Sequence, residues 1–95
     1  MAAYRRGWIL MENIYLDAIT EINPDAIVLT GFDDCIVGLC NTFEGSRLLY
    51  SEKKIIDKLS QDMTVEEAKE YYEFNILGGY LGTYTPIFLM DLDDY

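Results

Sequence analysis

A reciprocal helix-capping pattern, Thr64-Val65-Glu66-Glu67, constrains the fold of this chain more than any other stretch of its sequence. In such a capping box the Thr64 hydroxyl accepts a hydrogen bond from the Glu67 amide, and the Glu67 carboxylate accepts one from the Thr64 amide. Apolar residues then recur at helical spacing until a pair of glycines, where the backbone can turn left-handed and stop a helix. The pattern therefore predicts a helix over residues 65–77.

Two further amphipathic helices are predicted. Residues 12–22 carry apolar side chains four positions apart. Asn23-Pro24 ends that pattern, because the residue before a proline disfavours the helical conformation. Ser51 is a favoured helix cap, and the apolar stripe after it predicts a helix over residues 52–60.

Short apolar runs between these helices predict strands. Residues 26–30 (AIVLT) have the β-branched, apolar composition of a buried strand. Residues 35–43 and 47–50 flank a glycine-containing loop at residues 44–46, which favours a hairpin. Gly38 indicates a bulge or a close backbone approach within its strand. A final run, residues 86–90 (PIFLM), begins with a proline, which is tolerated at the first position of a strand.

The resulting order, α-β-β-β-α-α-β, keeps strands and helices in separate blocks. This order is typical of an α+β fold. We expect a single domain over residues 1–95, with a small antiparallel sheet of three to four strands and three helices packed on one face. Residues 1–10 are expected to be an extension or a flexible segment, and residues 92–95 a frayed acidic tail. No apolar run has the roughly 20 residues that a membrane-spanning helix needs.

The charge balance restricts the classes of function. The chain has 17 acidic and 7 basic residues, no histidine, and a net charge of −10. Direct binding of nucleic acid through a basic face is excluded, whereas a basic protein surface would be attracted. Cys35 and Cys40 have no histidine to activate them, and a Ser–His–Asp triad is excluded within one chain. We therefore expect no enzymatic activity, no resident metal and no cofactor.

Three stretches carry a resemblance to a known group of proteins. They are residues 25–38 (DAIVLTGFDDCIVG), 50–59 (YSEKKIIDKL) and 63–86 (MTVEEAKEYYEFNILGGYLGTYTP). The shared pattern runs G-F-D-D-x-I-x-G, then a tyrosine before a helix, then M-T-x-E-E-A-x-E-Y-x-x-F-N and a closing G-x-x-T-P. It resembles small, functionally uncharacterised proteins encoded by bacteriophages and in bacterial genomes. The resemblance implies a phage-type origin and a cytoplasmic setting, the host cytoplasm if the chain is phage-encoded, and no particular activity.

The favoured functional hypothesis is a non-catalytic protein-interaction module or inhibitor that acts on a host or phage protein. A basic, nucleic-acid-binding host protein would suit the acidic charge, because carboxylates on a rigid surface can mimic phosphates. The candidate residues lie on the polar face of the main helix and just after it. They are Glu66, Glu70, Glu73 and Tyr80. The same acids could equally form a solvated face that only keeps the protein soluble.

The alternative hypothesis is a small-ligand or divalent-cation binding module centred on Asp33, Asp34 and Asn75. Hard cations bind several oxygen ligands, although this spacing does not match a calcium loop. The two aspartates could instead bond to the amides of their own turn. A homodimer fits either hypothesis, because tyrosine-rich surfaces and short sheet edges invite pairing.

Overall fold

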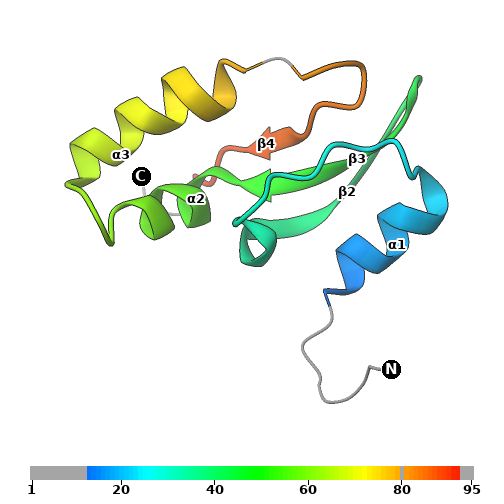
Figure 1. The fold of residues 1–95 in the computed structure, drawn as a ribbon, viewed down its shortest axis with the longest axis horizontal. Coiled ribbons are helices and arrows are strands. Elements are labelled where there is room, and N and C mark those ends of the chain that lie inside the picture. The colour runs from blue at the N-terminus through cyan, green and yellow to red at the C-terminus, as the bar shows by residue number, and fades with distance from the viewer. Residues whose placement is uncertain (1–12, 80, 93–95) are drawn as a thin grey trace.

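The computed structural model of the chain describes residues 13–79 and 81–92 (Figure 1). The predictions for residues 1–10 and for Tyr80 fall outside this range, as do residues 93–95 of the expected tail. The elements, in chain order, are α1 (Ile14–Ile22), a 3₁₀ turn η1 (Asp33–Cys35), β2 (Ile36–Thr42), β3 (Gly45–Ser51), α2 (Glu52–Leu59), α3 (Val65–Tyr71), a π-helical turn η2 (Tyr72–Leu77) and β4 (Ile87–Leu89). The predicted α+β class is confirmed. None of the helices that the structure describes is long and apolar enough to cross a bilayer.

The sheet is mixed, whereas an antiparallel sheet was predicted. Its strand order is β2-β3-β4, with β2 antiparallel and β4 parallel to β3 (Figure 1). The chain leaves β3 through α2 and α3 before it returns as β4. A long helical crossover of this kind brings the next strand back in the same direction. Strand direction was wrongly predicted because it depends on this connection and not on the residues of the strand.

The β2–β3 hairpin turns at residues 43–44, so the predicted loop at 44–46 begins one residue late. Gly45 is already paired in β3. It has a φ of 141°, and a Cβ there would lie 3.0 Å from the ring of Tyr84, so the position requires glycine. The strand register shifts between Ile36 and Gly38, which confirms the bulge predicted at Gly38.

The strand predicted at residues 26–30 is absent from the sheet. The segment is extended but makes only isolated contacts: the Ile27 N–H donates to the Tyr84 carbonyl at 3.2 Å, and the Leu29 N–H donates to the Tyr50 hydroxyl at 2.9 Å. Leu29 also packs against the core. The segment is apolar because it packs over the covered face of the sheet. A single sequence does not distinguish such a covering segment from a strand within the sheet.

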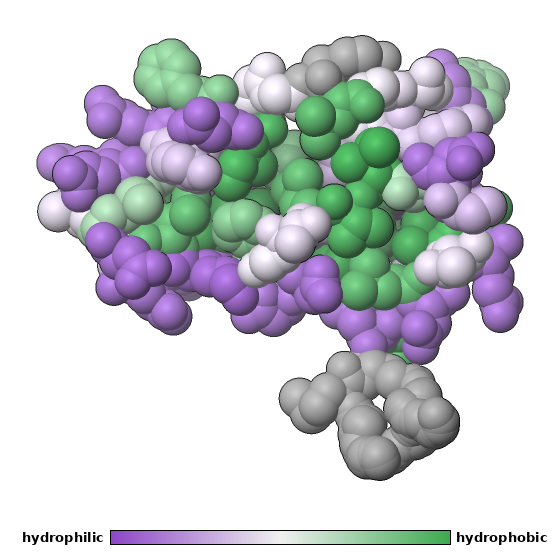
Figure 2. Space-filling view, in the orientation of Figure 1, coloured by the Kyte–Doolittle hydropathy of each residue, from purple (hydrophilic) through white to green (hydrophobic). Residues whose placement is uncertain are grey.

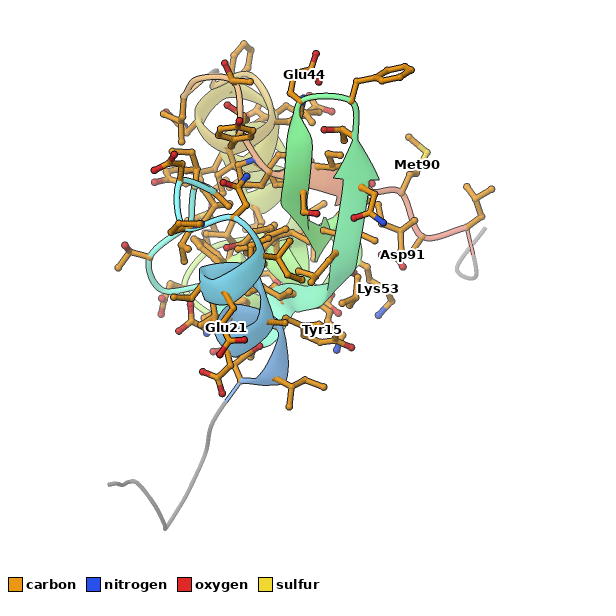
Figure 3. All side chains as sticks on the ribbon, turned by 90° about the vertical axis from the view of Figure 1, so that its right-hand side faces the viewer. Tyr15, Glu21, Glu44, Lys53, Met90 and Asp91 are labelled. Carbon is orange, nitrogen blue, oxygen red and sulfur yellow. The ribbon has the colours of Figure 1, made fainter. Side chains whose placement is uncertain are left out.

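One hydrophobic cluster joins the helices to a single face of the sheet. Leu48 and Tyr50, two apart on β3, point to this face and are fully buried. The Phe88 ring of β4 lies 6.1 Å from the Tyr50 ring, centroid to centroid. Figure 3 shows the helices on one side of the hairpin, as predicted. The buried members of the cluster are Ile19, Cys35, Ile36, Leu48, Tyr50, Ile55 and Tyr72.

The predicted N-terminal helix caps are present, whereas Gly78 ends the main helix with a φ of −77° and not in the left-handed conformation that was expected of the glycine pair. In α3 the Glu67 N–H lies 3.1 Å from the Thr64 hydroxyl, and the Thr64 N–H lies 3.0 Å from the Glu67 carboxylate. In α2 the Ser51 hydroxyl accepts from a backbone N–H of the first turn, and it donates to the Asp91 carboxylate at 2.6 Å. Asp91 also accepts from the Lys53 N–H at 3.2 Å, and the two residues lie side by side in Figure 3. Asp91 thus ties the end of β4 to the start of α2, a role that the sequence did not indicate.

Two buried tyrosines give a matched test of this core. Tyr50→Phe should lower the free energy of unfolding by about 1–2 kcal/mol, because the Leu29 N–H loses its acceptor. Tyr72→Phe should cost much less, because the buried Tyr72 hydroxyl makes no hydrogen bond of normal geometry among the described residues. Urea denaturation measures both values. Equal destabilisation by the two substitutions would contradict the role assigned to the Tyr50 hydroxyl.

Candidate functional site

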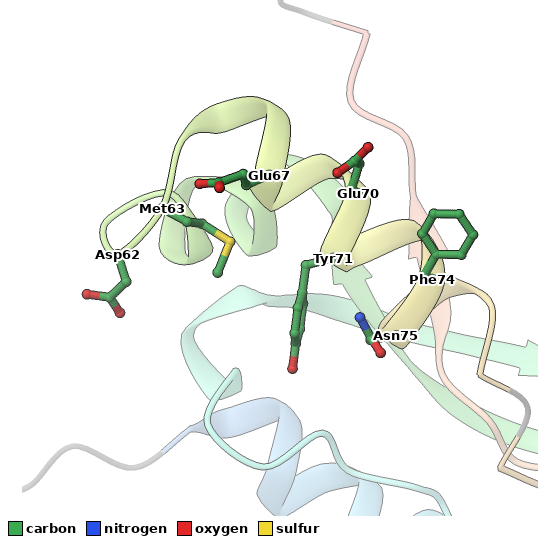
Figure 4. Close-up of a pocket in the computed structure, with 7 residues that line it drawn as sticks. All are labelled: Asp62, Met63, Glu67, Glu70, Tyr71, Phe74 and Asn75. Carbon is green, nitrogen blue, oxygen red and sulfur yellow. The ribbon is translucent and has the colours of Figure 1, made fainter.

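An open hollow of about 490 Å³ lies along α3 and η2 (Figure 4). Tyr71 and Asn75 extend to the same side of the helix, whereas Glu70 and Phe74 project from other sides of it. The Phe74 side chain is 79% exposed and that of Tyr71 is 45% exposed. We call this region the α3 surface; its residues are Asp62, Met63, Glu67, Glu70, Tyr71, Phe74 and Asn75.

Two aromatic side chains of α3 and the π-helical turn η2 lie outside the core. Ala68 and Tyr72 are buried, whereas Tyr71 and Phe74 are exposed. In η2 the Gly78 N–H donates to the Glu73 carbonyl at 3.0 Å, five residues back. This π turn changes the residue spacing only from Tyr72 onward, and Phe74 is exposed because it lies two residues after the buried Tyr72 and so points to the opposite side of the helix. Such turns are frequent at functional sites.

The α3 surface is strongly acidic. Four glutamates and a single lysine, Lys69, lie on α3 and η2. Glu67 is occupied by the capping box. The carboxylates of Glu66, Glu70 and Glu73 are exposed, and no ion pair within the described residues neutralises them. The exposed aromatic rings therefore lie in a field of uncompensated negative charge.

The structure brings the predicted interaction residues together only in part. Glu70 borders the α3 surface beside Phe74. Glu73 instead lines a smaller cavity of about 260 Å³, together with Glu52 and Lys69. Glu66 is exposed on α3 and lines neither cavity. Of the acids predicted from the helix pattern, Glu70 is thus the one placed next to exposed aromatic side chains.

The residues of the cation hypothesis are divided between separate places. Asp34 forms an ion pair with Lys58, with a carboxylate oxygen 2.9 Å from Nζ, and this contact lowers the pKa of Asp34. The Asp33 carbonyl accepts from the Asn13 side chain at 2.8 Å. Asp34 and Asn75 line different cavities. Among the described residues, no three His, Cys, Asp or Glu side chains form a group that could hold a metal ion.

Cys35 has the environment of a structural thiol. Its side chain is 2% exposed. Burial, reinforced by the neighbouring Asp34 carboxylate, raises the pKa of Cys35 to about 11. Since the thiolate is the nucleophilic form, this environment suppresses reactivity at neutral pH. The structure thus gives the Cys35 thiol a packed environment in which burial outweighs the favourable effect of the nearby Lys58 charge on the thiolate.

Comparison of the chain with known protein families, with curated proteins and with solved structures found no match.

The environment of Cys35 predicts its rate of alkylation. Its thiol pKa rises from an ordinary value of 9.0 to about 11, so the thiolate fraction at pH 8 falls by about a hundredfold. Iodoacetamide should therefore modify the half-buried Cys40 well before Cys35 in the folded protein. In denaturant the two rates should become similar, which peptide mass spectrometry can follow. Fast modification of Cys35 in the native protein would contradict the buried, unactivated environment assigned to it.

Proposed function

We propose that this chain is a non-catalytic protein-interaction module that binds a basic surface of a host or phage protein. The α3 surface is the binding face. The observation that carries the proposal is the exposed Phe74 side chain next to the uncompensated Glu70 carboxylate. Exposed aromatic residues supply much of the affinity at protein interfaces, and charges around them supply steering and specificity.

The chemistry of the α3 surface selects a class of partner. Arginine and lysine side chains can pair with Glu70 and stack on the rings of Tyr71 and Phe74. A partner segment that alternates basic and apolar residues would use both features at once. A basic, nucleic-acid-binding protein presents such a surface, and the module would then act as an inhibitor by competing with nucleic acid. Lys69 lies on the same helix and limits how far the acidic stripe extends.

Other observations agree with a binding role without catalysis. The chain has no histidine, and Cys35 is buried with a raised pKa. The proposal needs no cofactor. The resemblance to phage-encoded proteins supports the host cytoplasm as the setting in which the module meets its partner.

A pull-down with matched variants tests the proposal. The immobilised protein is exposed to bacterial lysate at low salt, and retained proteins are identified by mass spectrometry. A double variant, Glu70→Gln with Phe74→Ala, should retain at least tenfold less basic protein than the wild type does. The reason is that it removes one charge and one aromatic side chain from the α3 surface. Raising the salt should release the same proteins from the wild type, since screening weakens exposed charge pairs.

The control carries the same two substitutions elsewhere on the molecule. Glu21→Gln lies on α1, and Phe43→Ala lies in the hairpin turn, where Phe43 is fully exposed. This variant has the same charge and the same loss of aromatic surface, so it should retain the partners. Equal retention by both double variants, or retention mainly of acidic proteins, would refute the α3 surface as the binding face. Circular dichroism confirms that each variant is folded.

A further inference from the structure

The outer edge of β2 is open for strand pairing. β2 is an edge strand, with β3 between it and β4 (Figure 1). Within the residues that the structure describes, no backbone hydrogen bond joins residues 37–42 to a segment outside the hairpin. The buried residue of α1, Ile19, packs into the cluster that covers the face of the sheet. The outward-pointing backbone donors and acceptors of β2 therefore have no partner among residues 13–79 and 81–92.

Apart from the bulge at its beginning, β2 lacks the devices that commonly protect an edge strand. Natural edges carry charged side chains, prolines or bulges, or are kept very short. β2 has seven residues, IVGLCNT, with no charge and no proline. Its register shift lies at the beginning, between Ile36 and Gly38, and the pairing from Leu39 to Thr42 is regular. Most of the strand is thus a flat, uncharged template.

The hairpin is also electrically neutral in an otherwise acidic protein. Residues 35–51 contain one acid, Glu44, and one base, Arg47. These two form an ion pair at 3.5 Å. The whole chain has a net charge of −10, so two copies repel one another over most of their surfaces. At the neutral β2 edge two copies can approach with less of that repulsion than elsewhere on their surfaces.

We propose that two copies of this chain pair through the outer edges of β2, antiparallel about a two-fold axis, and form one continuous sheet. A strand edge paired with its own copy is self-complementary, as a two-fold interface must be. A second copy fits this edge better than a charged partner, because neither side presents a charge that needs compensation. The α3 surface lies on the far side of the sheet from β2, so both copies of it remain free (Figure 1).

The pairing goes beyond the proposed function and does not depend on it. Because both α3 surfaces stay accessible, the dimer would be bivalent, and the second binding event on a partner with two sites would be intramolecular. The two interactions should also respond to salt in opposite ways. Binding of a basic partner weakens as salt screens attraction, whereas the dimer strengthens as salt screens the remaining repulsion between two copies that each carry a net charge of −10.

Sedimentation velocity on the full chain over a wide concentration range, at low and high salt, is the first test. The wild type should move from the 11.0 kDa monomer to twice that mass as concentration rises, and more readily at high salt. Hydrogen exchange of the wild type is the second test. Amides of residues 37–42 should gain protection with concentration in step with the change in mass.

Two lysine substitutions locate the interface. Cys40 and Leu49 both point to the uncovered face of the sheet, since Leu48 and the opposing Leu39 point to the core. Cys40→Lys places a charge on the edge strand and should abolish the dimer, as edge lysines do in natural sheets. Leu49→Lys places the same charge on the central strand and should leave the dimer intact.

Three results would each overturn the proposal. One is a monomer at every concentration and salt. Another is a dimer that Leu49→Lys dissociates and Cys40→Lys does not, which would place the interface on the uncovered face. The third is a dimer whose β2 amides gain no protection; this readout needs no variant, so it holds even if Cys40→Lys fails to fold. None of these results bears on binding at the α3 surface.

Discussion

The burial of Tyr50, near the end of the central strand β3, holds the rest of the structure together. Its ring is fully buried and packs near Phe88, which brings the parallel strand β4 into the sheet. Its hydroxyl accepts from the Leu29 N–H, which fixes the extended segment that crosses the covered face. One side chain therefore connects the hairpin, the crossover strand and the covering loop. Leu48, two residues away, anchors the same face, and the helices pack around this pair.

A core built on one face of a three-stranded sheet leaves much apolar surface without a partner. Figure 2 shows apolar residues across the middle of one side of the molecule, bordered by hydrophilic ones. Phe74 on the helical side and Phe43 at the hairpin turn are largely exposed. A chain of this size has too few elements to cover every apolar group. A high net charge favours solubility, and the exposed apolar groups beside the acidic helix and along the neutral hairpin are the surfaces that we propose for contacts with other molecules.

Local signals in the sequence were sufficient for much of this fold. The capping box at Thr64, the cap at Ser51 and the bulge at Gly38 each depend on a few neighbouring residues, and each is present. The errors concern non-local pairing. Residues 26–30 have strand composition but no ladder partner, and the direction of β4 follows from the crossover. The candidate site was half predictable: Glu70 followed from the helix pattern, whereas the hollow that places it with Tyr71 and Phe74 depends on tertiary packing that a helix pattern does not reveal.

The distribution of charge links the two surfaces. The acids are concentrated on the helices, where the exposed carboxylates of α3 sit at positions that face away from the core. The strands must be apolar to build the core and the sheet, so the hairpin carries only the mutually compensated Glu44 and Arg47. The need to build the core from apolar strands thus leaves the acidic residues on the helices. It produces both the charged α3 surface and the neutral edge of β2. The charged surface suits a basic partner and the neutral edge suits a second copy, so neither occupant competes with the other.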